Sequence, residues 1–181
     1  MTGARPGSPG NPSSIVQAGR WQLRATSSSA TFAVGNFGGM RTVHGQVPIR
    51  HAWVDVDDTG RPLTVHAELD LVGIDTGNDR RDTDLRKPRL LDTEKFPTLT
   101  FVGGPGKSGT EGWSVPGTIA AHGAETAVVV TAVVADEPGS DDVTISATAQ
   151  FDRRALGVKA PRFLIGTQVG VSIQAVFTPA G

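Results

Sequence analysis

Strict alternation of apolar and polar residues is the feature of this chain that most constrains its fold. The clearest run, near the C-terminus, has apolar residues at every second position: Val143, Ile145, Ala147, Ala149 and Phe151. The run from Val169 to Phe177 repeats the pattern, with Gly170, Ser172 and Gln174 at alternate positions. Successive side chains of a strand point to opposite faces, so each run predicts a strand with one buried and one wet face. Such strands are typical of antiparallel sheets.

The same two-residue period recurs along the rest of the chain. It covers residues 21–25, 32–34, 43–49, 65–71, 99–101 and, with a break at Gly123, 113–134. Turn-forming residues separate the runs, as at 57–60 and 136–140. About eight strands result, a number that commonly closes into an up-and-down barrel without exposed edges. The fold prediction is therefore all-β, an eight-stranded antiparallel barrel.

Two segments depart from the strand pattern. Residues 78–91 are charged, with Leu85, Leu90 and Leu91 as apolar anchors, and Pro88 prevents a long helix. We expect one or two short helical turns there, across one end of the barrel. Residues 153–166 predict a second long connection.

The ends and the overall composition narrow the functional classes. Residues 1–14 are rich in Gly, Pro and Ser and predict a flexible tail, which leaves residues 15–181 as one domain. The tail lacks the apolar stretch of a signal peptide, so we expect a cytoplasmic protein. The net charge of −1 gives no attraction to nucleic acid, and no apolar run is long enough to span a bilayer.

The interior of such a barrel is either filled by side chains or holds one small ligand. The inward positions of the last strands are mostly Val and Ala, aromatic residues make up only 6% of the chain, and Tyr is absent. Small apolar walls would leave a dry tunnel for an acyl or prenyl chain, with about 0.8 kcal/mol gained per buried CH₂. Alternatively, Trp21, Phe32 and Phe101 fill the middle. Composition alone does not decide between the two.

Candidate chemical groups are few. The inward faces contain no titratable pair, so we expect no catalytic residue and no cofactor. The four His residues lack metal-ligand spacing and the chain has no Cys, so we expect no metal site.

Basic residues gather in the two long connections: Arg80, Arg81, Arg86, Lys87 and Arg89 in one, and Arg153, Arg154, Lys159 and Arg162 in the other. If both connections meet at one mouth, these residues could bind a phosphate or pyrophosphate. The alternative is that Arg81 and Arg153 make local salt bridges that fix the loops, and that the other basic residues are solvated.

Several short motifs, taken in order, are similar to those of the YceI-like family of bacterial proteins. They are Gly19-Arg20-Trp21, Thr31-Phe32-Ala33-Val34, Val43-His44-Gly45, Asn78-Asp79-Arg80-Arg81-Asp82, Phe96-Pro97-Thr98-Leu99-Thr100-Phe101 and Arg153 with Leu156-Gly157. The chain departs from the family at Arg24, Ser27 and Ser28, where relatives have Asp-x-x-His-Ser, and at Asp84, where they have His. If the histidines of relatives contact a lipid head group, this protein binds a different head group or uses other residues.

The resemblance implies a lipocalin-like barrel that binds, stores or transports a polyisoprenoid or similar long-chain amphiphile without catalysis. It favours the cavity, which we expect to be lined by Trp21, Phe32, Val34, Leu69, Phe101, Ile145, Ala147, Ala149, Val171 and Ile173. The head-group candidates are Arg81, Arg86, Arg153 and Arg162. Relatives also suggest a homodimer, and many are periplasmic or secreted. Two other functions stay open: a ligand-free structural or stress-related barrel, and an enzyme acting on an isoprenoid or quinone.

Overall fold

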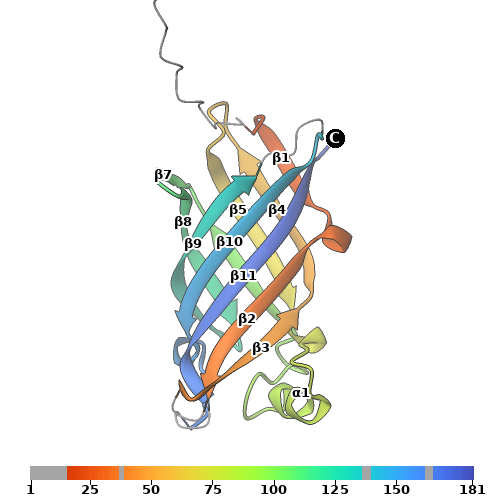
Figure 1. Cartoon of the computed structure of the whole chain (residues 1–181), viewed down its shortest axis with the longest axis vertical. Coiled ribbons are helices and arrows are strands. Elements are labelled where there is room, and N and C mark those ends of the chain that lie inside the picture. The colour runs from red at the N-terminus through yellow and green to blue at the C-terminus, as the bar shows by residue number, and fades with distance from the viewer. Residues whose placement is uncertain (1–15, 37–38, 136–139, 162–164) are drawn as a thin grey trace, which may run out of the picture.

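The computed structural model describes residues 16–36, 39–135, 140–161 and 165–181, and their strands form one closed barrel (Figure 1). The strands are β1 (Gly19–Leu23), β2 (Ser29–Asn36), β3 (Arg41–Val47), β4 (Ile49–Val56), β5 (Pro62–Asp70), β6 (Thr98–Gly103), β7 (Lys107–Gly109), β8 (Gly112–Ala121), β9 (Ala124–Ala135), β10 (Val143–Asp152) and β11 (Ile165–Pro179). All neighbouring strands are antiparallel.

Eleven strands make an eight-stranded barrel because some of them are parts of one longer strand. β1 and β2 are separated only by a 3₁₀ turn, Ala25–Ser27, and both pair with the long β11. β3 and β4 meet at Pro48, which has no N–H to donate to a ladder. β7 pairs only with β8 and forms a side hairpin. The predicted fold is confirmed.

The two ends of the barrel differ. The upper end, at the top of Figure 1, carries the β4–β5 turn and the C-terminus. The lower end carries helix α1 (Asp79–Arg86) and two 3₁₀ turns, Leu71–Gly73 and Arg153–Leu156. The Asn78 side chain caps α1 by accepting a bond from the Arg81 N–H at 3.0 Å, and the helix ends before Pro88. The short helix predicted across one end is confirmed.

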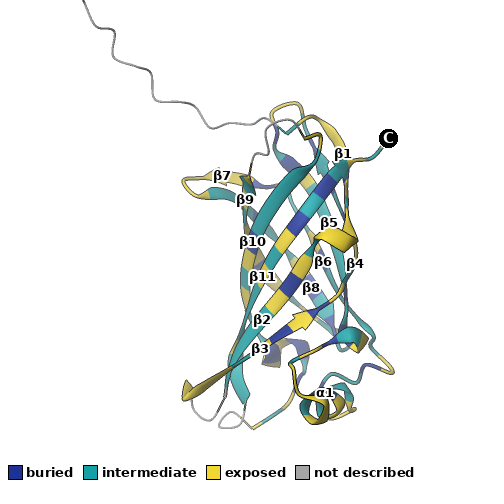
Figure 2. Cartoon of the chain, turned by 45° about the vertical axis from the view of Figure 1, so that its right-hand side comes forward, coloured by how far each residue is buried: buried dark blue, intermediate teal, exposed yellow. Residues whose placement is uncertain are grey.

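Burial follows the alternation of the sequence (Figure 2). Buried side chains form two clusters, one that includes Leu71, Leu156 and Phe101 and one at the upper end around Trp21 and Phe177. Partly buried side chains at mid-height join the clusters. The predicted tail, most of the predicted turn at 136–140 and Arg162 lie outside the described residues.

Candidate binding cavity

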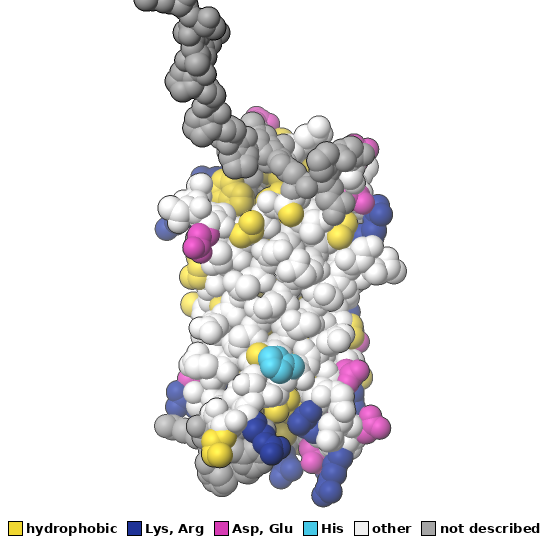
Figure 3. Space-filling view, in the orientation of Figure 1, with side chains coloured by type: hydrophobic (Ala, Val, Ile, Leu, Met, Phe, Trp, Pro, Cys, Tyr) yellow, Lys and Arg dark blue, Asp and Glu magenta, His cyan; other side chains and the backbone are white. Residues whose placement is uncertain are grey.

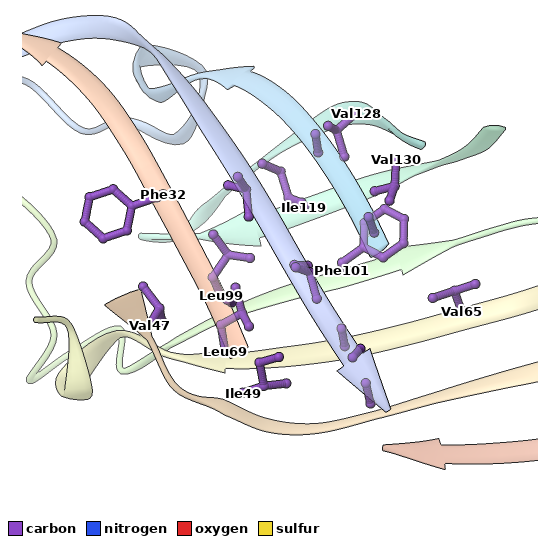
Figure 4. Close-up of a pocket in the computed structure, with 18 of the residues that line it drawn as sticks. Phe32, Val47, Ile49, Val65, Leu69, Leu99, Phe101, Ile119, Val128 and Val130 are labelled. Carbon is purple, nitrogen blue, oxygen red and sulfur yellow. The ribbon is translucent and has the colours of Figure 1, made fainter. Parts of the chain in front are cut away.

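A cavity of about 320 Å³ lies inside the barrel (Figure 4). Its lining extends from Trp21 and Phe177 at the upper end to Leu90 and Val158 at the lower end. The space is therefore long and narrow. Its volume falls at the lower end of the range of about 300–1,000 Å³ found for small-molecule sites.

The wall of this cavity is almost wholly apolar. Apart from the two indoles of Trp21 and Trp113, only Thr31 and Arg153 contribute a polar side chain among the described residues. The Trp21 indole N–H donates to the Gln17 carbonyl at 2.9 Å, so this polar group is satisfied. Such a wall binds through the burial of apolar surface and gives little directional selection.

The lumen is hollow. A packed protein interior leaves side chains fully enclosed, yet among the described residues no large side chain falls below 2% exposure. Inward side chains at mid-height, such as Val65, Ala67 and Val171, are only half-buried although they point away from bulk solvent. Their free surface faces the cavity, which is the space that the filled-barrel alternative excludes.

The structure places all ten predicted lining residues on the wall of the cavity. They are Trp21, Phe32, Val34, Leu69, Phe101, Ile145, Ala147, Ala149, Val171 and Ile173. Their contact with a ligand stays a prediction. The prediction omitted wall residues on neighbouring strands, among them Ile119, Val128 and Val130. The apolar alternation between Trp113 and Val134 was the signal that could have identified these residues.

Two of the predicted head-group arginines lie outside the cavity lining. Their guanidinium groups donate hydrogen bonds to oxygen atoms of the connection to which they belong. The Arg81 guanidinium donates to the Oγ1 and the carbonyl of Thr76 at 2.7 and 2.9 Å. Arg86 donates to the carbonyls of Val72 and Ile74, each at 2.8 Å. The alternative predicted a salt bridge for Arg81 and a solvated Arg86. Both guanidinium groups instead hold the loop through carbonyl or hydroxyl oxygens.

Arg153 is the one charged residue on the described cavity wall. It is 5% exposed. Its guanidinium donates to four carbonyls, those of Val158, Ala160, Ile165 and Gly166, at 2.7–3.0 Å. A buried charge is tolerated when it is hydrogen-bonded in this way. Arg153 thus fixes the second connection beneath the lumen.

Asp82 is a structural residue that sequence analysis missed. It is 5% exposed, and its carboxylate accepts bonds from the N–H of Thr76 at 3.0 Å and from the Thr76 hydroxyl at 2.5 Å. The family-like motif at 78–82 includes this aspartate, but the sequence could not show its partner, because Thr76 lies in a segment without a regular period.

The described groups with displaced pKa values lie on the outer surface. The Arg20 guanidinium lowers the pKa of Asp55 through a two-bond contact at 2.7 and 2.8 Å. Hydrogen bonds from the side chain and N–H of Arg154 lower the pKa of Asp152 to about 2. The described lining of the cavity holds no pair of titratable side chains.

Within the part of the chain that the structure covers, no helix is long and apolar enough to cross a membrane.

The profile of the YceI-like domain family matches residues 21–177. The chain therefore belongs to this family. No curated protein shows significant sequence similarity to it.

Solved structures share the fold at low sequence identity. BcnA of Burkholderia cenocepacia matches with a TM-score of 0.75 and 17% identity, over 85% of this chain and 98% of its own. A polyisoprenoid binding domain from Saccharophagus degradans matches with a TM-score of 0.66 and 14% identity, over 88% and 98%. The Campylobacter jejuni YceI protein matches with a TM-score of 0.61 and 17% identity, over 73% and 79%.

Proposed function

We propose that this YceI-like barrel binds a polyisoprenoid or another long-chain amphiphile in its lumen. It stores, shields or carries this ligand without catalysis. The observation that carries the proposal is the long apolar cavity between the two ends of the barrel. The Saccharophagus degradans domain with the same fold is described as polyisoprenoid-binding, which supports the same ligand class here.

The energetics suit a hydrocarbon chain. Burial of about ten methylene groups contributes about 8 kcal/mol without any polar contact. The only charged side chain on the described wall is Arg153, whose guanidinium already binds four carbonyls. A charged head group is therefore better placed outside the lumen. At the lower end of the face in Figure 3, Lys and Arg side chains lie interspersed with Asp and Glu side chains, so this end offers polar and charged partners for a head group.

An enzyme receives less support from the geometry. Acid–base chemistry on a bound isoprenoid needs titratable groups within hydrogen-bond reach of the reacting atoms. The described lining offers only Arg153, whose guanidinium is engaged, and Thr31, which is exposed and whose hydroxyl donates to the Ser172 carbonyl at 3.3 Å.

Native mass spectrometry of the protein purified from its own host tests the proposal, followed by solvent extraction and lipid identification. We expect a bound mass that extraction identifies as a long-chain isoprenoid or related amphiphile. An apo mass that does not change on incubation with polyprenols would contradict the proposal and favour a ligand-free scaffold.

A further inference from the structure

Two aromatic rings of the lumen lie directly on glycine backbones. A Cβ atom built on Gly45 would lie 2.4 Å from Cζ of Phe32. A Cβ on Gly103 would lie 2.4 Å from the Phe101 ring, and one on Gly117 would lie 2.5 Å from it. Each ring therefore occupies the space that a side chain on the glycine would need.

The strand register creates these contacts. Phe32 on β2 pairs directly with Gly45 on β3. Gly103 on β6 pairs with Gly117 on β8, and Phe101 precedes Gly103 by two residues, so it lies on the same face. None of the three glycines has a positive φ, so the backbone does not require glycine at these positions. At Gly45 the ring is the main obstacle to a side chain, and at Gly103 and Gly117 the ring and a backbone oxygen both exclude one, as when an aromatic side chain covers a strand glycine in a designed barrel.

Because the rings of Phe32 and Phe101 lie against the barrel wall, these large inward side chains do not fill the lumen. With any side chain at Gly45, the Phe32 ring would have to leave the wall, and the cavity that it lines is the open space beside it. The same argument applies to Phe101 over Gly103 and Gly117. The bore of the lumen therefore depends on three missing side chains as much as on the small Val and Ala residues.

We infer that the contacts of Phe32 with Gly45 and of Phe101 with Gly103 and Gly117 determine which ligands the lumen admits. They favour a single flexible hydrocarbon chain over a rigid fused-ring lipid. This inference rests on the proposed function. A cavity of about 320 Å³ that extends between both ends of the barrel is narrow. A flexible chain can follow this cavity, whereas a rigid fused-ring system needs a cavity as wide as the whole ring system at one height in the barrel.

Gly45 gives the cleanest test. Its next nearest atom after the Phe32 ring is the Asp75 carbonyl oxygen at 3.0 Å, so a methyl group there acts mainly on the ring. At Gly103 and Gly117 a methyl group would also meet the backbone oxygens of Pro116 and Val102, at 2.8 and 2.5 Å. Gly170→Ala is the matched control, because its Cβ would meet only the Ala33 oxygen, at 3.9 Å.

The experiment measures uptake of solanesol, a long polyprenol, and of cholesterol by the full chain, using native mass spectrometry. We expect the wild type and Gly170→Ala to take up solanesol and to exclude cholesterol. Gly45→Ala should lower solanesol affinity about tenfold, the loss of about two methylene contacts. Gly45→Ala combined with Phe32→Leu should restore it.

The outcomes separate the inference from the proposed function. A wild type that takes up neither lipid overturns both. A Gly45→Ala variant that binds solanesol like the wild type, or a wild type that accepts cholesterol, overturns the inference alone. If Gly45→Ala does not fold, Phe32→Trp narrows the bore from the ring side without changing a glycine. A folded Phe32→Trp variant with unchanged solanesol affinity overturns the inference as well.

Discussion

The two long connections at the lower end of the barrel use arginine in the same way but at different depths. In the α1 connection, Arg81 and Arg86 are half-buried and bind oxygens of residues 72–76. In the second connection, Arg153 is buried, binds four carbonyls and forms part of the cavity wall. All three were predicted to contact a head group. In all three, backbone or hydroxyl oxygens of the loop occupy guanidinium donors.

The difference teaches that burial decides what such an arginine contributes. An exposed guanidinium exchanges its bonds with water at little net cost. A buried one leaves carbonyls without partners when it is removed, and each buried unsatisfied group costs about 1–3 kcal/mol. The second connection should therefore depend on its arginine far more than the first.

Arg153→Met should give the largest effect, a loss of about 3–5 kcal/mol in the free energy of unfolding, because four carbonyls lose their donor in a buried site. Urea denaturation of the full chain measures it. Arg154→Met is the matched control, since that neighbouring side chain is exposed. A loss below about 1 kcal/mol for Arg153→Met would mean that the connection holds without its arginine.

Asp82→Asn should come next, with a loss of about 1–3 kcal/mol. The variant keeps the shape but replaces a charged acceptor that binds the Thr76 N–H and hydroxyl. The same denaturation series measures it, with exposed Asp79→Asn as the control. Equal stabilities of the two variants would show that the α1 connection does not depend on this buried carboxylate.

Arg86→Met should cost about 1 kcal/mol, because its bonds to Val72 and Ile74 join loop groups that are partly open to water. Affinity for solanesyl phosphate, which carries an anionic head group, should not change, since Arg86 lies outside the cavity lining. A weaker uptake by a folded Arg86→Met variant would break the comparison and return this arginine to the head-group site.

Acid titration should show the smallest effect, at Asp152, before the 3₁₀ turn of the second connection. Its folded pKa of about 2 lies below the ordinary value of 3.8 because of its bonds with Arg154. A lowered pKa stabilises the fold above the ordinary value, and this stability is lost as pH falls from about 4 to about 2. Arg154→Gln should reduce the difference in Tm between these pH values. An identical pH dependence in the variant would remove Asp152 as its source.

Period-two alternation predicted the barrel because, in an antiparallel strand with one wet face, the positions of the apolar residues identify the side that faces the core. The same alternation predicted that Trp21, Phe101 and Ile173 face inward. It could not show that Phe101 lies flat on Gly103 and Gly117, because that contact depends on the register between β6 and β8. Nor could it show where the donors of Arg153 go, because their acceptors lie in a connection without a period.

Fluorescence quenching by a brominated long-chain alcohol tests the central claim most directly, since a bromine atom quenches only a tryptophan that it contacts. Trp21 and Trp113 line the cavity, whereas Trp53 lies on the outer face, stacked between Arg20 and His66. We predict quenching in the Trp53→Phe variant and none in the Trp21→Phe/Trp113→Phe variant. Equal quenching in both variants, or quenching of Trp53 alone, would contradict a ligand site inside the barrel.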